Sequence, residues 1–406
     1  MIDILTNIDQ EFPVLQQQVR GNPLIYLDNG ATTQKPTSVL DRMHAFSSEE
    51  NATVHRGIYY LSQQATRYCD NVRQNAQRFI HAESSDEIIF VRGTTEAINL
   101  VSYGVANALL EPGQEILISE MEHHSNIVPW QQICKHYDFQ LKMIPFLDDG
   151  QLDLEAFSQL LSKRTGFVSL VHVSNSLGTI NPIKDIIDAA HKVGAYVLID
   201  GAQSIAHMPI NVQELDCDFF CFSGHKMYGP TGVGILYGKA ELLNRMPPYQ
   251  SGGDMIDHVA FEGTRFAPLP YKFEAGTPAI ESIIGLGEAI QFIERIGWDK
   301  IEQIESDLTQ YLEDSVGDIE GVKRFGITKP RAGLVSFILD GCHAYDVGTL
   351  LDQQGVCVRV GHHCTQPVMT HYGIDATIRA SIACYNTRLD IDGLCKGLRK
   401  AQSMLK

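Results

Sequence analysis

The sequence predicts an α/β fold: a large domain built on a mostly parallel, seven-stranded sheet, followed by a smaller α+β domain. Two observations support this prediction. Up to about residue 240, short apolar runs alternate with segments of helical period, and most of these runs are continuously apolar, as strands covered on both faces are. After about residue 275 this alternation ends, and a long helical segment precedes further short runs.

The candidate strands of the large domain are short runs rich in apolar residues: 88–91, 116–119, 141–146, 167–173, 195–199, 218–222 and 233–237. The segments between them have the spacing of amphipathic helices. In the clearest of these, 62–80, one face carries Ala65, Val72, Ala76, Phe79 and Ile80.

The C-terminal part predicts the smaller domain. Its expected elements are helices over 279–315 and 390–404 and strands over 333–339, 356–360 and 377–383. A helix over 1–19 is expected to join them. The predicted domains are therefore residues 20–275, and residues 276–406 together with 1–19.

Composition narrows the functional classes. With 44% hydrophobic and 20% charged residues among 406, the chain has the balance of a globular protein rather than of a disordered, collagen-like or coiled-coil one. Its 32 basic and 49 acidic residues leave a net charge of −17, which repels phosphate backbones and anionic lipid. We therefore expect neither a nucleic-acid partner nor a membrane partner.

The sequence also predicts a cytoplasmic location. Its first residues, MIDILTNIDQEF, lack the basic start and apolar run of a secretory signal, and no stretch approaches the roughly 18 apolar residues of a membrane span. The nine cysteines are an odd number without a CxxC pair, which favours reduced thiols over a disulfide framework.

The segment SGHKMYGPTG (223–232) directly follows a predicted buried strand. Lys226 would then lie in the crevice at the carboxyl end of the sheet, where open α/β folds bind ligands. A partly desolvated lysine is a usable amine nucleophile, suited to a Schiff base. A surface lysine in a glycine-rich turn is an equal alternative on this segment alone.

Two further features share that end of the predicted sheet. Asp200 ends the apolar run AYVLID, where a carboxylate needs a cationic partner such as a protonated pyridine nitrogen. The alternative is a solvated aspartate that caps the next helix through Gln203. Thr94 and Thr95 open a helix after the strand 88–91, and its free N–H groups would bind a cofactor phosphate. A simple N-cap role for Thr95 is the alternative.

Together these residues resemble the class V, fold-type I pyridoxal 5′-phosphate (PLP) enzymes, which share an aminotransferase-like fold. Within them the chain resembles the Suf-type (group II) cysteine desulfurases, also called selenocysteine lyases. Further matching stretches cover essentially the whole chain: LDNGATTQKP (27–36), NATVHRGIYYLS (51–62), MEHHSNIVPWQ (121–131), HVSNSLGTINPI (172–183), FEAGTPAI (273–280), VRVGHHCTQP (358–367) and IRASIACYNT (378–387).

The resemblance implies a role for each matching residue. The implied cofactor ligands are Thr94, Thr95, His123, Asp200, Gln203, Ser223, His225, Lys226 and, from the partner subunit, Thr277. Among these, Lys226 binds PLP covalently, Asp200 pairs with the pyridine nitrogen, and His123 stacks on the ring and helps to move protons. The implied residues around the substrate are Asn175, Arg359 and Arg379, with His55 and Arg56 approaching across the dimer.

Cys364 is the implied nucleophile. The loop GHHCTQP (361–367) is polar, whereas the other eight cysteines lie in apolar or helical contexts. A neighbouring histidine favours the reactive thiolate. By resemblance, Cys364 attacks the substrate sulfur and becomes a persulfide. The histidine pairs 123–124 and 362–363 raise zinc as an alternative, but we expect no metal, because the PLP site accounts for these residues.

The implied function is a PLP-dependent cysteine desulfurase that converts L-cysteine to L-alanine. It would supply sulfur for iron–sulfur cluster assembly through a SufE-like acceptor protein, and L-selenocysteine is an expected second substrate. A cysteine-sulfinate desulfinase and a selenocysteine-specific lyase are alternatives of the same fold. Two further alternatives are an aminotransferase and a sulfur-transfer scaffold without PLP. The first is disfavoured because Cys364 would have no role in it, and the second because Lys226 and Asp200 would have none.

The segment 249–262 resembles the interface hairpin of the family and implies a homodimer with shared active sites. The chain departs from the family pattern at Asn29-Gly30 and at Thr365-Gln366. We expect neither departure to affect an assigned role.

Overall fold

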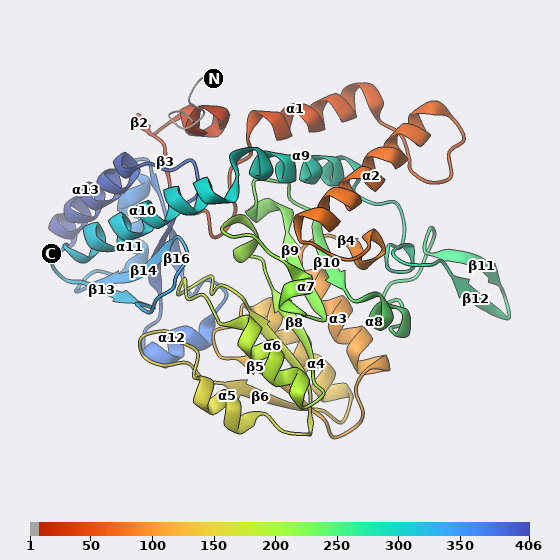
Figure 1. Ribbon diagram of the computed structural model, residues 1–406. Coiled ribbons are helices and arrows are strands. Elements are labelled where there is room, and N and C mark those ends of the chain that lie inside the picture. Colours follow the sequence, from red (N-terminus) through yellow and green to blue (C-terminus); the bar gives the residue numbers. More distant parts are fainter. Residues whose placement is uncertain (1–7) are drawn as a thin grey trace.

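The computed structural model describes residues 8–406, which form a large seven-stranded sheet and a smaller four-stranded sheet, each packed against helices (Figure 1). The large sheet holds all seven predicted strands: β4 (Ile88–Val91), β5 (Glu115–Ser119), β6 (Gln140–Ile144), β7 (Thr165–Val171), β8 (Tyr196–Asp200), β9 (Phe219–Ser223) and β10 (Gly234–Gly238). Their spatial order is β4-β10-β9-β8-β7-β5-β6. Strands β9, β8, β7, β5 and β6 pair in parallel, while β10 runs antiparallel to both its neighbours. The predicted mostly parallel sheet is confirmed.

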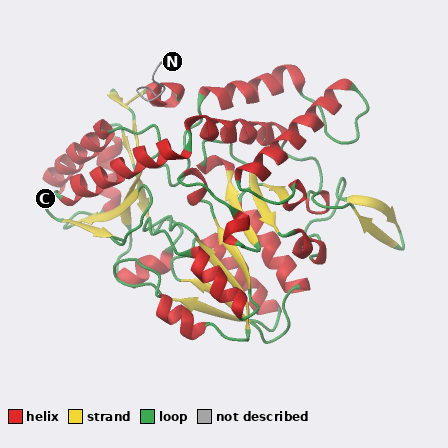
Figure 2. Cartoon of the chain, in the orientation of Figure 1, coloured by secondary structure: helices red, strands yellow, loops and turns green. Residues whose placement is uncertain are grey.

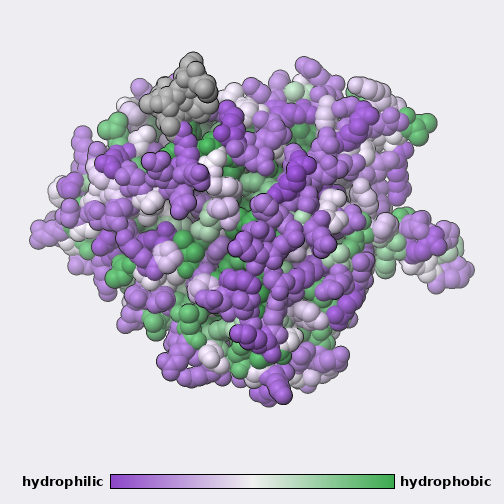
Figure 3. All heavy atoms as spheres, viewed as in Figure 1, coloured by the Kyte–Doolittle hydropathy of each residue, from purple (hydrophilic) through white to green (hydrophobic). Residues whose placement is uncertain are grey.

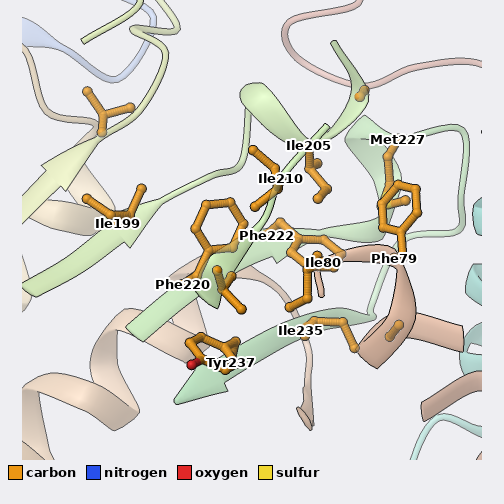
Figure 4. Close-up of a cluster of buried hydrophobic side chains, with 14 of the residues drawn as sticks. Phe79, Ile80, Ile199, Ile205, Ile210, Phe220, Phe222, Met227, Ile235 and Tyr237 are labelled. Atoms are coloured by element: carbon orange, nitrogen blue, oxygen red, sulfur yellow. The ribbon is translucent and has the colours of Figure 1, made fainter. Parts of the chain in front are cut away.

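Both faces of the large sheet are covered, as the continuous apolar runs predict. Alternate residues of a strand belong to different hydrophobic clusters: Phe220 and Phe222 to one, Phe219 and Cys221 to the other. Figure 4 shows Phe220 and Phe222 of β9 gathered with Ile235 of β10 in the first cluster. Successive side chains of a strand point to opposite faces of the sheet, and here each face is covered by its own hydrophobic core. A run that is apolar at every position is therefore stable as a strand inside the sheet.

The helices of this part lie on either side of the sheet (Figure 2). They are α1 (Thr37–Ala45), α2 (Tyr60–Phe79), α3 (Thr94–Ala108), α4 (Val128–His136), α5 (Leu154–Leu160), α6 (Ile183–Lys192), α7 (Val212–Leu215), α8 (Ala240–Arg245) and α9 (Ile280–Ile296). The predicted apolar face of 62–80 is buried along α2.

The smaller sheet is antiparallel, in the order β13-β14-β17-β16. Its strands are β13 (Val322–Phe325), β14 (Leu334–Leu339), β16 (Arg359–Gly361) and β17 (Thr377–Ser381). The helices of this part are α10 (Trp298–Gly317), α11 (Ala344–Asp352), α12 (Gln366–Tyr372) and α13 (Arg388–Leu405). The predicted strand 356–360 is divided, because β15 (Val356–Cys357) instead pairs in parallel with β3 (Ile25–Tyr26).

Two predicted helices are wrong in extent. The segment 279–315 is broken at Gly297, whose φ of +85° suits glycine, so that α9 packs on α1 and α2 while α10 packs on α13 and β14. The first seven residues of the predicted helix 1–19 lie outside the described residues. The remainder forms two short 3₁₀ helices, η1 (Ile8–Glu11) and η2 (Pro13–Gln16), and then strand β1 (Gln18–Val19), which pairs with β2 (Asn22–Pro23). The predicted domain boundary at residue 275 remains a prediction. Because α9 packs with the helices of the large domain, we propose that the boundary lies later, at Gly297.

The surface visible in Figure 3 is mostly hydrophilic. The hairpin of β11 (Ile256–Ala260) and β12 (Gly263–Phe266) stands away from the body of the molecule (Figure 1). Within residues 8–406, none of the helices combines the length and the apolar character that crossing a membrane requires.

Candidate active site

A cavity of about 350 Å³ lies where the carboxyl ends of the parallel strands meet the smaller sheet. Loops after β4, β5, β7, β8 and β9 line one side, and residues of β16, β17 and the loop before α12 line the other. It brings together most of the predicted site residues: Thr94, Thr95, His123, Asn175, Asp200, Gln203, Ser223, His225, Lys226, Arg359, Cys364 and Arg379.

Three predicted residues lie elsewhere in the chain. Thr277 lines a separate cavity. The His55 ring packs on Tyr271 with centroids 5.0 Å apart, and Arg56 Nε lies 3.1 Å from an Asp254 carboxylate oxygen. The roles expected for them across a dimer interface stay predictions.

Lys226 ends a short 3₁₀ turn, η7 (Gly224–Lys226), that follows β9 directly. Burial lowers the pKa of Lys226 to about 8, against the opposing effect of the Asp200 carboxylate. A larger fraction of this amine is therefore neutral at physiological pH than for an exposed lysine, which is the form that acts as nucleophile or base.

Asp200 is the last residue of β8 and is only 2% exposed. Burial raises the pKa of this carboxyl group, while the Ala202 N–H, 2.9 Å from Oδ1, and the positive charge of Lys226 act in the opposite direction. A carboxylate so deeply buried requires a further cationic partner in the cavity to remain charged.

His123 follows β5 and caps the short helix η5 (His124–Asn126). Its Nδ1 accepts a hydrogen bond from the Ser125 N–H at 3.1 Å, which assigns the ring proton to Nε2. Burial lowers the pKa of His123 to about 4, and the charge of Lys226 contributes to this. The imidazole is therefore neutral at pH 7. His123 thus combines an N-cap role with a place in the cavity.

The first turn of α3 faces the cavity. Gly93 has a φ of +152°, and a Cβ there would lie 3.1 Å from Ser223 Oγ, so the turn from β4 into α3 suits glycine. Thr94 N–H donates to Ser223 Oγ at 2.8 Å. The free N–H groups of this helix, with the hydroxyls of Thr95 and Ser223 beside them, form a site for an anion.

Two arginines occupy paired positions on β17 and β16. Arg379 donates from Nη1 to the carbonyl oxygen of Asn175 at 2.7 Å and from Nη2 to Asp28 at 3.1 Å, while Arg359 Nε lies 3.8 Å from the other Asp28 oxygen. Arg379 is almost fully buried, and burial lowers its pKa, against the opposing charge of Asp28. Among residues 8–406, neither Arg379 Nε nor Asn175 Oδ1 has a hydrogen-bond partner, so both remain available to a ligand.

Cys364 is exposed at the tip of a constrained loop. His363 and Cys364 have φ values of +52° and +59°, which are unusual for residues with a side chain. Two other loops hold this backbone: His124 N–H donates to the Cys364 carbonyl at 2.8 Å, and Asn175 Nδ2 donates to the His363 carbonyl at 2.7 Å. The thiol is therefore presented from a fixed backbone.

The departure at Asn29-Gly30 lies beside the site, because Gly30 contacts two predicted site residues, and its effect on their roles stays a prediction. Its carbonyl accepts a hydrogen bond from Gln203 Nε2 at 2.7 Å, and a Cβ on it would lie 3.1 Å from the Arg379 guanidinium carbon. The tight approach of an arginine to this glycine leaves no trace in the local sequence. The cavity also includes residues that sequence reasoning missed: Ser125, Tyr345 and His362.

Comparison with known proteins identifies the family of the chain. Residues 25–394 match the family described as aminotransferase class-V. The chain is 50% identical over 395 residues to a probable cysteine desulfurase of Halalkalibacterium halodurans, with 97% of each chain covered. It is 46% identical over 402 residues to a cysteine desulfurase of Dickeya dadantii, with 99% of this chain and 97% of that one covered. The solved apo structure of a cysteine desulfurase from Thermococcus onnurineus has a TM-score of 0.91 at 36% identity, over 97% of this chain and 98% of that one. The chain therefore belongs to the aminotransferase class-V family of fold-type I enzymes, and its cofactor is pyridoxal 5′-phosphate.

Proposed function

We propose that this chain is a cysteine desulfurase that converts L-cysteine to L-alanine and keeps the sulfur as a persulfide on Cys364. The observation that carries the proposal is that one cavity contains both a partly buried lysine of lowered pKa, Lys226, and the exposed thiol of Cys364. The names of relatives that are about half identical over nearly the whole chain support it.

The residues present fit PLP. Lys226 offers the amine for its aldehyde, the first turn of α3 with Ser223 offers an anion site for its phosphate, and Asp200 offers a buried carboxylate for its ring nitrogen. We assign the neutral imidazole of His123 to one face of the ring. When bound, the cofactor withdraws electron density from the substrate Cα.

The carboxylate of the substrate has a matching site. Arg379 Nε is a buried donor without a hydrogen-bond partner in the described part of the chain, whereas the amide of Asn175 is placed beside it by the Arg379 Nη1 bond to the Asn175 carbonyl. Arg379 Nη2 carries a second N–H beside the one directed at Asp28, so Nε and Nη2 together offer a fork to a carboxylate. The more exposed Arg359 lines the same side of the cavity and adds positive charge.

The chain's own residues then divide the chemistry. The neutral amine of Lys226 removes the proton from the substrate Cα. The Cys364 thiolate attacks the substrate Sγ, so that an S–S bond forms as the substrate Cβ–Sγ bond breaks and the carbon skeleton retains the electron pair. Proton uptake at that carbon (Cβ), and return of a proton from Lys226 to Cα, give alanine. The balance is cysteine plus the Cys364 thiol going to alanine plus the Cys364 persulfide.

Further parts of the proposal concern partners and location. We assign the persulfide sulfur to a SufE-like acceptor protein that serves iron–sulfur cluster assembly in the cytoplasm, and L-selenocysteine as a second substrate. We also propose a homodimer. The exposed hairpin of β11 and β12 supports it, as does the position of Thr277 in a cavity other than that of Lys226.

The test is a pair of cysteine substitutions in the PLP-loaded enzyme. Cys364→Ala is expected to abolish alanine formation from L-cysteine while leaving bound PLP in place, since the thiol receives the sulfur. Cys342→Ala, which removes a partly buried thiol from a turn after β14, is the control and is expected to keep full activity.

Peptide mapping after L-cysteine treatment, alkylation and borohydride reduction completes this test. It is expected to find the cofactor fixed on Lys226 and an extra sulfur on Cys364. Alanine formation by Cys364→Ala at the rate of the unmodified enzyme would contradict the assignment of the nucleophile. Relative rates with cysteine, selenocysteine and cysteine sulfinate distinguish a desulfurase from the alternatives of the same fold.

A further inference from the structure

Glu122 occupies the point at which β5 leaves the sheet. β5 pairs with β7 as far as Ile118 and Ser169, after which the chain turns away toward His123. Beyond that point the buried Glu122 side chain bonds to β7 in place of the β5 backbone. Its Oε1 accepts a hydrogen bond from the backbone N–H of Val171 at 3.0 Å and lies 2.5 Å from Ser119 Oγ. A carboxyl oxygen thus replaces the backbone carbonyl that a longer β5 would offer to β7.

The second oxygen of Glu122 belongs to a network whose donors and acceptors are fixed. Oε2 accepts from Asn126 Nδ2 at 2.7 Å, and Asn126 Oδ1 accepts from Trp130 Nε1 at 2.8 Å. Ser169 Oγ also donates to Asn126 Oδ1, at 2.6 Å. Because an indole N–H can only donate, the orientation of the Asn126 amide is determined, and its NH₂ group must face Glu122.

This arrangement joins two walls of the cavity. His123, which lines the cavity, follows Glu122 directly in the chain, and Val171, which also lines it, pairs in register with Asp200. We propose that Glu122 is a positioning residue: its carboxyl group sets the separation between His123 and the edge of the sheet that carries Asp200. The inference rests on the cofactor-binding roles proposed above for His123 and Asp200.

The donor–acceptor pattern provides a sharp test. In Glu122→Gln, an NH₂ group replaces one oxygen and must face a donor, either Val171 N–H or Asn126 Nδ2. We expect this variant to bind PLP at least about tenfold more weakly and to have a shifted visible absorption band. The reason is that two donors facing each other in a buried place move apart, which displaces the wall of the cavity that carries His123. Adding Asn126→Asp exchanges the donor for an acceptor that still serves Trp130 and Ser169. The double variant is therefore expected to recover most of the lost affinity.

Glu87→Gln is the matched control. Glu87 is also a buried carboxyl group that accepts backbone N–H groups, from Ala240 at 3.1 Å and from Ser84 at 3.3 Å, but it lies outside the cavity. It is expected to leave PLP affinity within about twofold while lowering stability. Cofactor titration is read separately from desulfuration, so failure of the proposed activity in the unmodified enzyme is distinguishable from failure of this inference.

Unchanged PLP affinity in Glu122→Gln would overturn the inference. So would a folded double variant that binds PLP as weakly as the single one. If the single variant does not fold, the double variant decides. A folded double variant with ordinary PLP affinity supports the inference. Failure of both variants to fold contradicts it, because exchanging the donor and the acceptor then does not restore the hydrogen bonds.

Discussion

At the scale of single residues, burial governs the protonation of the cavity. It lowers the pKa of Lys226 to about 8 and that of His123 to about 4, and it raises the pKa of Asp200. At neutral pH the cavity therefore contains a partly deprotonated amine beside a neutral imidazole. These are the forms that a nucleophilic lysine and an uncharged face for an aromatic cofactor require.

A pH dependence follows for the binding of PLP by the apoenzyme. The neutral amine of Lys226 is the reacting form, so the rate of PLP addition is expected to rise with pH through about 8 and then level off. The negative charge of Asp200 raises the pKa of Lys226, so Asp200→Asn is expected to move the rise to lower pH. Stopped-flow absorbance at a series of pH values measures both. A rate that still climbs steeply at pH 10, as for an ordinary lysine, would contradict the assignment.

The sequence could reveal the residues whose chemistry shows in their local pattern. Lys226 and Asp200 each follow an apolar run, and strand ends of a parallel sheet converge, so their meeting in one cavity was predictable. Gly30 was not, because its importance arises from the approach of Arg379, which is distant in sequence. Glu122 was equally hidden, since its partner Val171 becomes a neighbour only when β5 and β7 pair.

At the scale of elements, the ends of strands buried on both faces were predicted to within two residues. A short, continuous apolar run bounded by polar segments is typical of such a strand. The failures have physical causes. Apolar residues continue across Gly297, so the helical pattern hides a break that depends on one positive φ. The run 356–360 divides because Cys357 pairs with Tyr26 and Arg359 with Arg379, and the choice of a pairing partner is a property of the whole fold.

One buried ion pair links two elements and gives stability a pH dependence. His207, just after the turn that follows β8, lies with Nδ1 2.6 Å from Glu305 Oε2 on α10. Burial disfavours the charged imidazole, but the Glu305 carboxylate outweighs this and raises the pKa of His207 above its usual value. A group whose pKa is raised on folding stabilises the protein fully below its unfolded pKa, and this contribution is lost as pH rises through the folded value.

His207→Gln is therefore expected to cost about 2 kcal/mol of unfolding free energy at pH 6 and clearly less at pH 9. Urea denaturation of the PLP-loaded protein at both pH values measures the difference. Glu305→Gln is expected to flatten the same dependence. His44→Gln, at an exposed position on α1, is the control and is expected to cost less than about 0.5 kcal/mol at either pH. An equal loss at both pH values for His207→Gln would show that the imidazole is not charged in the folded protein.

At the scale of the whole molecule, the cavity depends on both sheets. The large sheet supplies Lys226 and Asp200, the smaller one supplies Arg379 and Arg359, and the Cys364 loop is held by hydrogen bonds from the large part. The sequence could place each residue at the end of an element. The hydrogen bond from His124 to the Cys364 backbone follows only from how the two parts pack.

In the proposed homodimer, the second chain would complete the cofactor site of the first. In one chain Thr277 lines a cavity separate from that of Lys226, so its predicted role at the phosphate requires a second copy. The surface expected to meet that copy exposes large apolar side chains: Ile58 is 93% exposed, and Phe261 at the tip of the β11–β12 hairpin is fully exposed. Exposed large apolar side chains are typical of an interface.

Charges placed on this surface are expected to separate the subunits and weaken cofactor binding together. Ile58→Glu combined with Phe261→Glu would bury two unpaired carboxylates in the interface, so sedimentation velocity is expected to find mainly monomer. PLP titration of the same sample is expected to give an affinity lowered several-fold, because each monomer lacks the partner's Thr277.

Leu389→Glu is the matched control: Leu389 is 78% exposed but lies on α13, outside the predicted interface, and its substitution is expected to change neither property. A monomeric variant that binds PLP as tightly as the unmodified enzyme would remove Thr277 from the phosphate site, whereas an unchanged dimer would place the interface on another face of the molecule.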